Sequence, residues 1–406
     1  MQKHYKIMQQ PISPFSKAQL MQKEERLEVS NQNEKLCIGL PKETSFQEKR
    51  ICLTPDAVSA LTNNGHRILI ESGAGENAAF DDQEYSEAGA EITKNTAKVF
   101  ACPMILKVEP PTLKEIELIK PNTILISALQ LKMQQKSYFE ALTNKKITAL
   151  GFEFIKDSEG AFPAVRQLSE IAGTASIQIA AEIMSITNQG NGLLLGNISG
   201  VPPTEVVVIG AGIVGEFATK SALGLGANVK VFDSSISKLR TLQANVGQRI
   251  YTSTMQHKNL IKALMRCDVA VGATKGKNRA PILVNEAMVD SMKEGAVIID
   301  VSIDMGGCFE TSELTTHDNP TFEKHGVIHY CVPNIPARYS RTSSVSLSNI
   351  FTSYILQIAE AGGLENAIRQ DHGLKNGLYV YHGVITNKSI SNWFDLDCND
   401  LNLLIF

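Results

Sequence analysis

Apolar residues along the chain follow two alternating patterns. From residue 36 onward, short runs rich in Val, Ile and Leu alternate with stretches whose apolar positions recur at the spacing of a helix. Strands that alternate with helices in this way are typical of βαβ units around parallel sheets, so we predict an α/β fold. The predicted strands cover residues 36–40, 67–71, 104–108, 123–129 and 147–154 in the first half, and 205–209, 228–232, 268–273, 296–303 and 327–332 in the second.

Helix signals divide these strands into two sets. Thr54, Pro55 and Asp56 predict a helix start, because a hydroxyl side chain precedes a proline and an acid of the first turn. Residues 171–186 form a long, mostly apolar helical stretch that connects the two sets. The pattern turns helical again over residues 345–360 and then ends in a polar, irregular tail. Because this last helix follows a complete second set of strands, we expect it to return to the first domain.

Length and composition are those of an ordinary globular protein. With 406 residues, 43% of them apolar and 20% charged, the chain is long enough for two or three domains. Its 39 Lys and Arg against 42 Asp and Glu give a net charge of −3, so no excess positive field favours nucleic acid or an anionic membrane surface. No run of 18 apolar residues predicts a membrane span.

Cysteine usage points to a reducing compartment. The 7 cysteines are odd in number, widely spaced and never in a CxxC pair, which indicates buried thiols rather than a disulfide framework or a zinc site. The first 35 residues contain no apolar run of signal-peptide length. We therefore expect a cytoplasmic protein without a bound metal.

A glycine-rich loop follows the predicted strand at 205–209. Gly210 allows a tight turn, Gly212 lets a pyrophosphate approach the backbone, and Gly215 lets the next helix pack closely on the strand. Asp233, which lies 23 residues after Gly210, ends the following strand, where a carboxylate accepts hydrogen bonds from an adenosine ribose. The alternative is a close-packed helix start without a ligand, but the flanking strands and the acid favour a dinucleotide.

The residues after this acid indicate which dinucleotide is bound. Ser234 and Ser235 follow Asp233, and no arginine stands where it would meet a 2′-phosphate. Lys238 and Arg240 follow a few residues later and weaken the distinction. We predict NAD in preference to NADP.

Two charged residues stand at the ends of apolar runs. Lys107 interrupts the run at 104–108, and Asp304 ends the run at 297–303. Open α/β sheets bind ligands beyond the carboxyl ends of their strands, so such a charge is either functional or solvated at the rim. The residues by themselves leave both interpretations open.

Several further segments carry specific sequence. They are residues 38–43, Arg50 with 53–55, 73–75, 106–108 with Pro110, 169–173, 200–203, 304–310, and 329–332 with Asn334. With the glycine loop, they resemble the alanine dehydrogenase family, which is related to the α subunits of nicotinamide nucleotide transhydrogenases. The resemblance covers residues 36 to 383, and the segment at 304–310 favours the dehydrogenase branch.

This resemblance implies two Rossmann-like doubly wound domains, with the NAD domain inserted into a discontinuous substrate domain. We place an N-terminal extension at 1–35, the first part of the substrate domain at 36–163, the NAD-binding domain at 164–340, and C-terminal helices with the tail at 341–406. The implied activity is the reversible oxidative deamination of L-alanine to pyruvate and ammonia, an L-alanine catabolism reaction with hydride transfer to NAD. The family also implies a homo-oligomer.

The resemblance assigns residues as well. In the family, residues matching Arg50 and Lys107 hold the substrate, and the residue matching Asp304 takes part in the chemistry. The cofactor contacts implied by the motif and the resemblance are Ser169, Gly210, Gly212, Ile213, Gly215, Asp233, Lys238, Thr274, Lys275, Val301, Ser302, Ile303, Asp304, Val332, Asn334 and Ile335.

One site position departs from the family. Gln130 stands where the family has a histidine, and glutamine hydrogen-bonds a carboxylate or water but accepts no proton in the working pH range. Two other interpretations therefore stay open: the NAD(H)-binding α subunit of a transhydrogenase, and a catalytically weakened NAD-binding relative. In a dehydrogenase, the proton must go to Asp304, to Lys107 with a lowered pKa, or to Lys132, which strand alternation would place on the face of Gln130.

Overall fold

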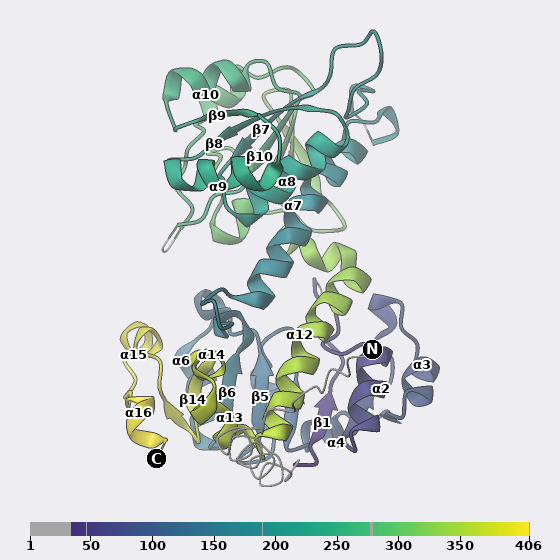
Figure 1. Cartoon of the computed structure of the whole chain (residues 1–406), viewed down its shortest axis with the longest axis vertical. Helices are drawn as coiled ribbons and strands as arrows, with labels where there is room; N and C mark the ends of the chain where they lie inside the picture. Colours follow the sequence, from purple (N-terminus) through teal and green to yellow (C-terminus); the bar gives the residue numbers. More distant parts are fainter. Residues whose placement is uncertain (1–33, 46, 189, 277–278, 406) are drawn as a thin grey trace, which may run out of the picture.

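The computed structural model describes residues 34–45, 47–188, 190–276 and 279–405. These residues form two lobes, each built around its own β-sheet (Figure 1). Residues 1–33 make up nearly all of the predicted N-terminal extension and lie outside the described residues.

The first sheet consists of six parallel strands extended by two C-terminal strands. The parallel strands are β1 (Cys37–Leu40), β2 (Arg67–Glu71), β3 (Glu91–Thr93), β4 (Met104–Leu106), β5 (Ile124–Ser127) and β6 (Thr148–Gly151). β14 (Leu378–Tyr381) pairs antiparallel with β6, and β15 (Val384–Ile385) pairs antiparallel with β14. The strands lie in the order β15-β14-β6-β5-β4-β1-β2-β3. From β1 the sheet is extended on one side by β2 and β3 and on the other side by β4, β5 and β6, so the order reverses between β1 and β4, although these two strands are parallel.

The second sheet repeats this plan. Its strands are β7 (Glu205–Ile209), β8 (Asn228–Phe232), β9 (Tyr251–Ser253), β10 (Val269–Gly272), β11 (Val297–Asp300), β12 (Thr321–Lys324) and β13 (Val327–Tyr330). The order is β12-β13-β11-β10-β7-β8-β9, with β12 antiparallel to β13 and a reversal between β7 and β10. Two doubly wound sheets, one interposed in the sequence of the other, confirm the predicted fold class.

Short helices cover the sheets. The first lobe carries α2 (Pro55–Asn63), α3 (Asp82–Glu87), α4 (Thr96–Phe100), α5 (Leu113–Leu118) and α6 (Lys136–Asn144), with the 3₁₀ turns η1 (Glu76–Ala78), η2 (Leu131–Met133) and η3 (Phe152–Phe154). The second carries α8 (Ile213–Gly224), α9 (Ile236–Val246), α10 (His257–Leu264) and α11 (Glu286–Asp290), with the 3₁₀ turns η4 (Ile186–Asn188), η5 (Val301–Met305) and η6 (Ile335–Tyr339).

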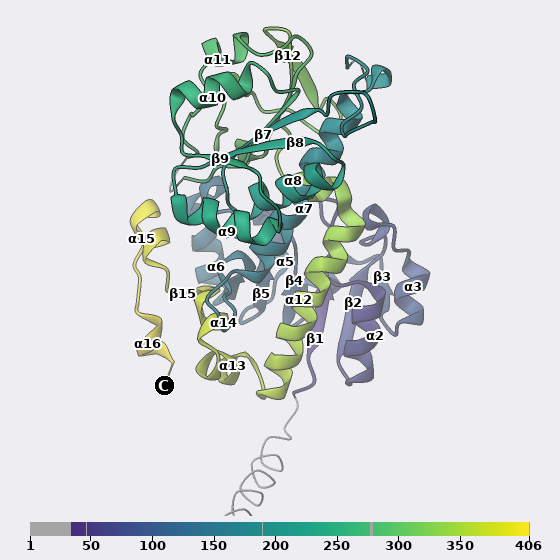
Figure 2. The same ribbon diagram turned by 45° about the horizontal axis from the view of Figure 1, so that its top comes forward.

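Two long helices join the lobes. α7 (Pro163–Ile183) leads from the first lobe to the second, and α12 (Ser340–Glu360) leads back beside it (Figure 2). Leu347, Phe351 and Ile355 of α12 recur at i, i+4 spacing and share one core with Ile38 and Ile70 of the first sheet. The predicted return of this helix to the first domain is therefore observed.

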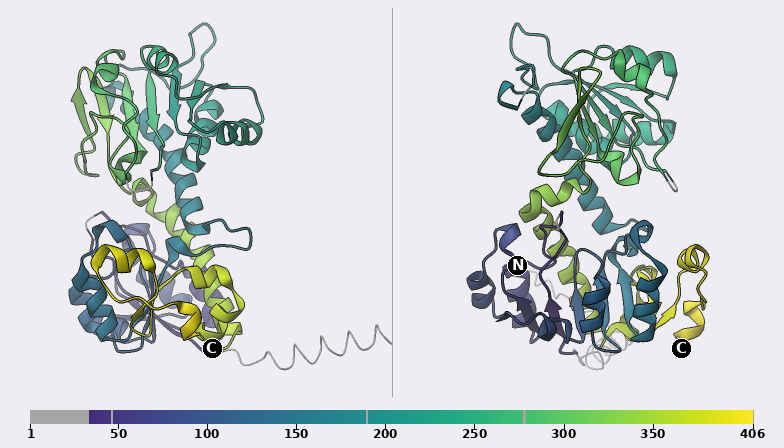
Figure 3. Two further views of the ribbon diagram at one scale, coloured as in Figure 1. Left: turned by 90° about the vertical axis from the view of Figure 1, so that its left-hand side faces the viewer. Right: turned by 180° about the vertical axis from the view of Figure 1, so that it is seen from behind.

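The segment after α12 differs from the predicted irregular tail. It contains α13 (Leu364–Gln370), α14 (His372–Asn376), β14, β15, α15 (Lys388–Phe394) and α16 (Leu401–Leu404), all on the first lobe (Figure 3). The prediction was wrong because β14 and β15 are too short to stand out in the sequence, yet Leu378 and Val380 are buried where β14 pairs with β6. The domain limits drawn from the sequence stay a prediction.

Several predicted strands end earlier than expected at their carboxyl ends, two of them by three residues. The run at 147–154 leaves the sheet after Gly151 and forms η3, and the run at 296–303 leaves it after Asp300 and forms η5. The Asp300 side chain accepts a hydrogen bond from the backbone N–H of Ser302, which stabilises the turn. Asp304 thus lies on a turn beyond the strand.

The predicted helix start at Thr54 is confirmed, but the hydroxyl group has another role. α2 begins at Pro55, and the Thr54 side chain makes no capping hydrogen bond. Its Oγ1 lies 3.2 Å from Ser348 Oγ on α12, and its backbone N–H donates to the same oxygen at 3.0 Å. The residue therefore ties the helix start to the returning helix.

Candidate active site between the lobes

A cavity of about 850 Å³ is lined by residues of both lobes. From the first lobe and α7 it receives Arg50, Val108, Ala128, Gln130, Phe152, Glu153, Ala161, Phe162, Val165, Arg166, Leu168, Ser169 and Ala172. From the second it receives Gly212, Ile213, Val214, Asp233, Ser234, Lys238, Met255, Ala273, Thr274, Lys275, Pro281, Leu283, Val301, Ser302, Asp304, Met305, Asn334 and Pro336. The size and the mostly apolar lining suit a small-molecule ligand or cofactor.

The glycine loop has the geometry that its sequence predicts. Gly210 has φ +115°, and a Cβ there would lie 2.3 Å from the Ala273 carbonyl oxygen. A Cβ on Gly215 would lie 1.8 Å from the Gly210 carbonyl oxygen, so only glycine lets α8 approach β7 this closely. At Gly212 an added Cβ would meet nothing within 4 Å, so the N-terminus of α8 is open to the cavity.

Asp233 braces this loop from the end of β8. Its Oδ2 accepts a hydrogen bond from Ala211 N at 2.7 Å, and its Oδ1 accepts one from Ser235 N at 2.7 Å. The side chain is largely buried but still lines the cavity. A carboxylate is thus fixed beside the open helix end.

The other predicted cofactor residues fall into two groups. Those lining the cavity are Ser169, Gly212, Ile213, Asp233, Lys238, Thr274, Lys275, Val301, Ser302, Asp304 and Asn334. Those packed behind its wall are Gly210, Gly215, Ile303, Val332 and Ile335. The backbone N–H of Thr274 donates to Ser302 Oγ at 2.9 Å, so the ends of β10 and β11 are connected at the cavity wall.

A hydrogen-bonded chain crosses between the lobes at Arg50. The guanidinium donates to Glu48 through Nε at 2.7 Å and Nη2 at 2.5 Å, and both residues are buried. Asn334, with φ +54°, donates from Nδ2 to Glu48 Oε2 at 3.1 Å and from its backbone N–H to Asp304 Oδ1 at 2.9 Å. The structure thus brings together three residues that the sequence analysis assigned to the site, namely Arg50, Asn334 and Asp304.

Among the residues linked by these hydrogen bonds, Arg50 is the cation and Glu48 and Asp304 are the carboxylates. Burial alone would raise the pKa of Glu48, but the Arg50 guanidinium outweighs burial and holds the pKa below its ordinary value. Asp304 is open to the cavity, yet protein atoms crowd its carboxylate and this burial raises its pKa, which Asn334 and Arg50 only partly offset.

Lys107 is buried away from the cavity. Its Nζ lies 3.0 Å from Glu43 Oε2 and 3.1 Å from Glu115 Oε1, and its side chain is 1% exposed. Burial lowers its pKa, but the two carboxylates outweigh burial and raise it above the ordinary value. The prediction that the Lys107 pKa falls towards neutrality is wrong, because the sequence does not show that Glu43 and Glu115 lie next to this lysine.

Gln130 faces the cavity from a left-handed turn, with φ +49°. Glu153 Oε1 accepts from the backbone N–H groups of Leu129 and Gln130 at 2.7 and 3.2 Å, which fixes this turn. The Gln130 Nε2 group donates to Glu109 Oε2 at 2.9 Å. The prediction that Lys132 shares a strand face with Gln130 is wrong, because the chain forms the 3₁₀ turn η2 directly after Gln130. Lys132 Nζ instead contacts Met305 Sδ at 3.3 Å.

Sequence reasoning missed three carboxylates of this site, namely Glu48, Glu109 and Glu153. Glu48 stands two residues before Arg50, and Glu109 stands two residues after Lys107. Their proximity to predicted site residues was a usable signal. Glu153 could not be placed, because it was predicted inside a strand, whereas β6 ends at Gly151 and Glu153 lies on η3.

Other features of the described residues bear on the interpretation. No described histidine lines this cavity, and the described residues form no group of three His, Cys, Asp or Glu that could hold a metal ion. Of the helices in residues 34–405 that the structure describes, none has the length and apolar character needed to cross a membrane.

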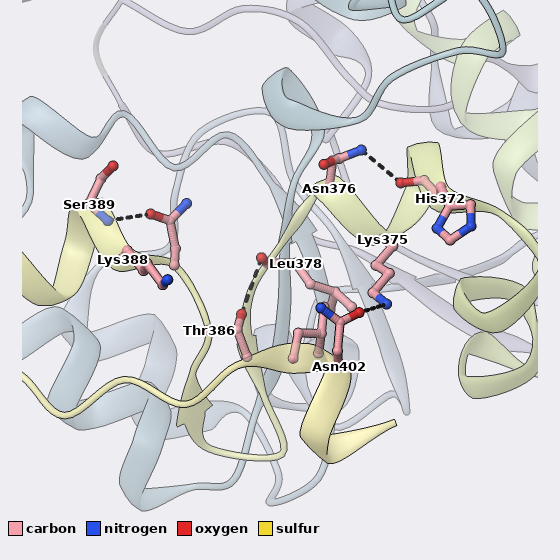
Figure 4. Close-up of a pocket in the computed structure, with 10 residues that line it drawn as sticks. His372, Lys375, Asn376, Leu378, Thr386, Lys388, Ser389 and Asn402 are labelled. Atoms are coloured by element: carbon pink, nitrogen blue, oxygen red, sulfur yellow. Dashed lines mark hydrogen bonds between the residues drawn. The ribbon is translucent and has the colours of Figure 1, made fainter. Parts of the chain in front are cut away.

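A second hollow of about 490 Å³ lies among α14, β14, β15, α15 and α16 (Figure 4). Its walls are polar: Lys375 Nζ donates to Asn402 Oδ1 at 2.6 Å, and Asn376 Nδ2 donates to the His372 carbonyl at 2.7 Å. None of the predicted site residues lines it.

Comparisons with known proteins agree with the architecture. Models of the alanine dehydrogenase/PNT N-terminal and C-terminal domains match residues 39–172 and 176–388. Alanine dehydrogenase of Methanococcus maripaludis is 41% identical over 364 residues, 89% of this chain and 97% of that protein. Alanine dehydrogenase 2 of Staphylococcus aureus is 39% identical over 362 residues, again 89% of this chain and 97% of that protein.

Solved structures give the same result. An L-alanine dehydrogenase matches with a TM-score of 0.82 and 34% identity, covering 88% of this chain and 98% of that one. A transhydrogenase from Sinorhizobium meliloti matches with a TM-score of 0.75 and 22% identity, covering 87% and 99%, and this likeness concerns the fold alone.

Proposed function

The chain belongs to the alanine dehydrogenase/PNT family, and from this premise we propose that it is an NAD-dependent alanine dehydrogenase that reversibly deaminates L-alanine to pyruvate and ammonia. One observation carries the proposal: the open glycine loop and the buried guanidinium of Arg50 line the same cavity from opposite lobes. A dinucleotide on the loop and an amino-acid carboxylate on Arg50 would thus meet in one enclosed space.

Family membership implies a nicotinamide dinucleotide, and we propose NAD rather than NADP. The open N-terminus of α8 fits a pyrophosphate, and Asp233 at the end of β8 fits a ribose hydroxyl and repels a 2′-phosphate. When bound, the cofactor takes the hydride that leaves the alanine Cα. The predicted cofactor residues that line the cavity would contact it, and those behind the wall would hold the loops in place.

For the substrate, we propose that Arg50 binds the alanine carboxylate. Glu48 occupies Nε and Nη2 of the guanidinium, and the donors on Nη1 suit a substrate carboxylate. Asp304, at the second lobe's edge of the cavity, would orient the amine or the attacking water. Gln130 would hydrogen-bond the substrate or that water.

Lys107 takes a positioning role in this proposal. Its ammonium group holds Glu43, whose Oε1 accepts a hydrogen bond from Val108 N at 2.6 Å. Val108 lines the cavity, so the buried ion pair fixes the wall beside Arg50. The sequence-based role of Lys107 as a substrate ligand is replaced here by an indirect one.

The remaining parts of the proposal concern organisation. The substrate domain would comprise residues 36–163 and 341–406 and the NAD domain residues 164–340. We propose a cytoplasmic homo-oligomer that acts on small molecules and needs no nucleic-acid partner.

Alanine-dependent reduction of NAD by the purified full chain tests the activity. We expect steady-state reduction that requires both alanine and NAD. The Arg50→Met protein should show a raised alanine KM with an unchanged NAD Kd, because the glycine loop lies in the other lobe. Absence of alanine-dependent reduction in the unmodified protein would contradict the proposed function.

A further inference from the structure

Glu109 lies at the point where the strand order of the first sheet reverses. It follows β4, whose neighbour across the reversal is β1, and ligands of doubly wound sheets bind at this position. Val108, one residue earlier, lines the cavity, and so does Gln130, which donates its amide hydrogen to Glu109. The half-buried carboxylate of Glu109 is thus at the edge of the space proposed for the substrate.

The charges around Glu109 are unevenly paired. Arg50 is engaged by both oxygens of Glu48, whereas Glu109 receives a hydrogen bond from the neutral amide of Gln130 and lies against the carboxyl group of Glu48. Lys107, on the same strand end, is buried between Glu43 and Glu115. Asp304 adds a further carboxylate from the second lobe. Three carboxylates, those of Glu48, Glu109 and Asp304, therefore interact with the same cation, Arg50, at the place proposed for alanine.

We propose that Glu109 receives the ammonium group of the amino-acid substrate and accepts the proton that this group loses before hydride leaves the Cα. The inference rests on the proposed function and names the residue that does the work of the family's histidine. An alanine zwitterion would be held at both ends, by Arg50 at its carboxylate and by Glu109 at its ammonium group.

The proton and electron balance follows directly. An N–H bond of the ammonium group breaks and an O–H bond forms on Glu109, which leaves a neutral amine. Hydride departs from Cα with its bonding pair to the oxidised nicotinamide, and the amine lone pair closes the C=N bond of an iminium. Water adds at that carbon and ammonium leaves, giving pyruvate. Glu109 then returns its proton to solvent, which is the one proton released per turnover.

The surroundings suit this task. Burial and the charge of Glu48 raise the pKa of Glu109, whereas Gln130 and Arg50 lower it only in part. Proton transfer is most effective when the pKa of the base approaches the working pH. Gln130, being neutral, orients the carboxylate without the full loss of basicity that a cationic partner would cause.

The test compares three substitutions at this position with the unmodified protein. Glu109→Gln keeps the shape and an acceptor for Gln130 but accepts no proton, so kcat/KM for alanine should fall ~10²–10⁴-fold, and the remaining rate should rise with pH as free amine becomes available. Glu109→Asp should retain the pH profile of the unmodified protein at a reduced rate. NAD Kd, measured by fluorescence titration, should be unchanged in both.

Glu109→Lys tests which end of the substrate, the ammonium group or the carboxylate, lies against residue 109. A lysine should repel the ammonium group of alanine and weaken alanine binding, whereas pyruvate, which lacks that group, should inhibit as well as before or better. If the substrate carboxylate instead lies against residue 109, the lysine would tighten alanine binding, and that result would overturn the inference. Glu117→Gln, an exposed position on α5, is the matched control and should behave as the unmodified protein.

The two proposals fail in different ways. An unmodified protein that oxidises alanine, together with a Glu109→Gln protein of unchanged kcat/KM and pH profile, would overturn this inference alone. An unmodified protein that neither binds nor oxidises alanine would overturn the proposed function and this inference with it.

Discussion

The buried pair of Lys107 and Glu43 makes the stability of the protein depend on pH in a predictable direction. Burial raises the pKa of Glu43 from 4.5 to about 7, although the Lys107 ammonium and the Val108 N–H act against burial. The folded protein therefore holds this proton more tightly than the unfolded chain does. Stability contributed by the protonated form is present below pH 4.5 and is lost as the pH rises towards 7.

The size of the effect follows from the same values. The interval from 4.5 to about 7 corresponds, at 1.36 kcal/mol for each pH unit, to about 3 kcal/mol in total, of which about 2.5 kcal/mol falls between pH 5 and pH 8. Glu43→Gln keeps the shape and the acceptor for Val108 but has no proton to release. The free energy of unfolding of the variant, relative to the unmodified protein, should therefore rise by about 2 to 3 kcal/mol between pH 5 and pH 8.

Urea unfolding followed by circular dichroism, at a fixed protein concentration and at several pH values, measures this difference. The exposed-site variant Glu117→Gln controls for the loss of one negative charge. Parallel pH profiles for the Glu43→Gln and unmodified proteins would refute the reasoning, because they would mean that Glu43 does not change its proton affinity on folding.

Two further predictions concern the cofactor lobe. Asp233→Ser should raise the ratio of kcat/KM with NADP to kcat/KM with NAD, because it removes the charge that would repel a 2′-phosphate; steady-state assays with each cofactor measure this ratio, and an unchanged ratio would count against the assignment. Gly215→Ala places a Cβ 1.8 Å from the Gly210 carbonyl, so it should destabilise the lobe by about 1–3 kcal/mol and weaken NAD binding at least tenfold, as thermal unfolding and equilibrium titration would show. Unaltered NAD affinity in the alanine variant would contradict the close packing of α8 on β7.

The sequence alone determined the parts of this protein that rest on local pattern. The strands at 67–71, 205–209 and 228–232 have the predicted limits, because each is a short apolar run bounded by turn residues or charges. The glycine loop was equally readable, since Gly210 and Gly215 are required by backbone geometry that no other residue satisfies. The family followed from such motifs as well.

Tertiary structure decided what depends on partners distant in the chain. β14 and β15 are too short to be recognised alone. β14 becomes a strand because the edge of β6 offers hydrogen bonds and a buried surface, and β15 then pairs with β14. The partners of Lys107 were decided in the same way. A lysine at a strand end contacts either a ligand or buried carboxylates, and which of these it contacts depends on how the segments after β1 and β4 pack. Charge pairing across long sequence separations sets pKa values and binding roles, and no local pattern encodes it.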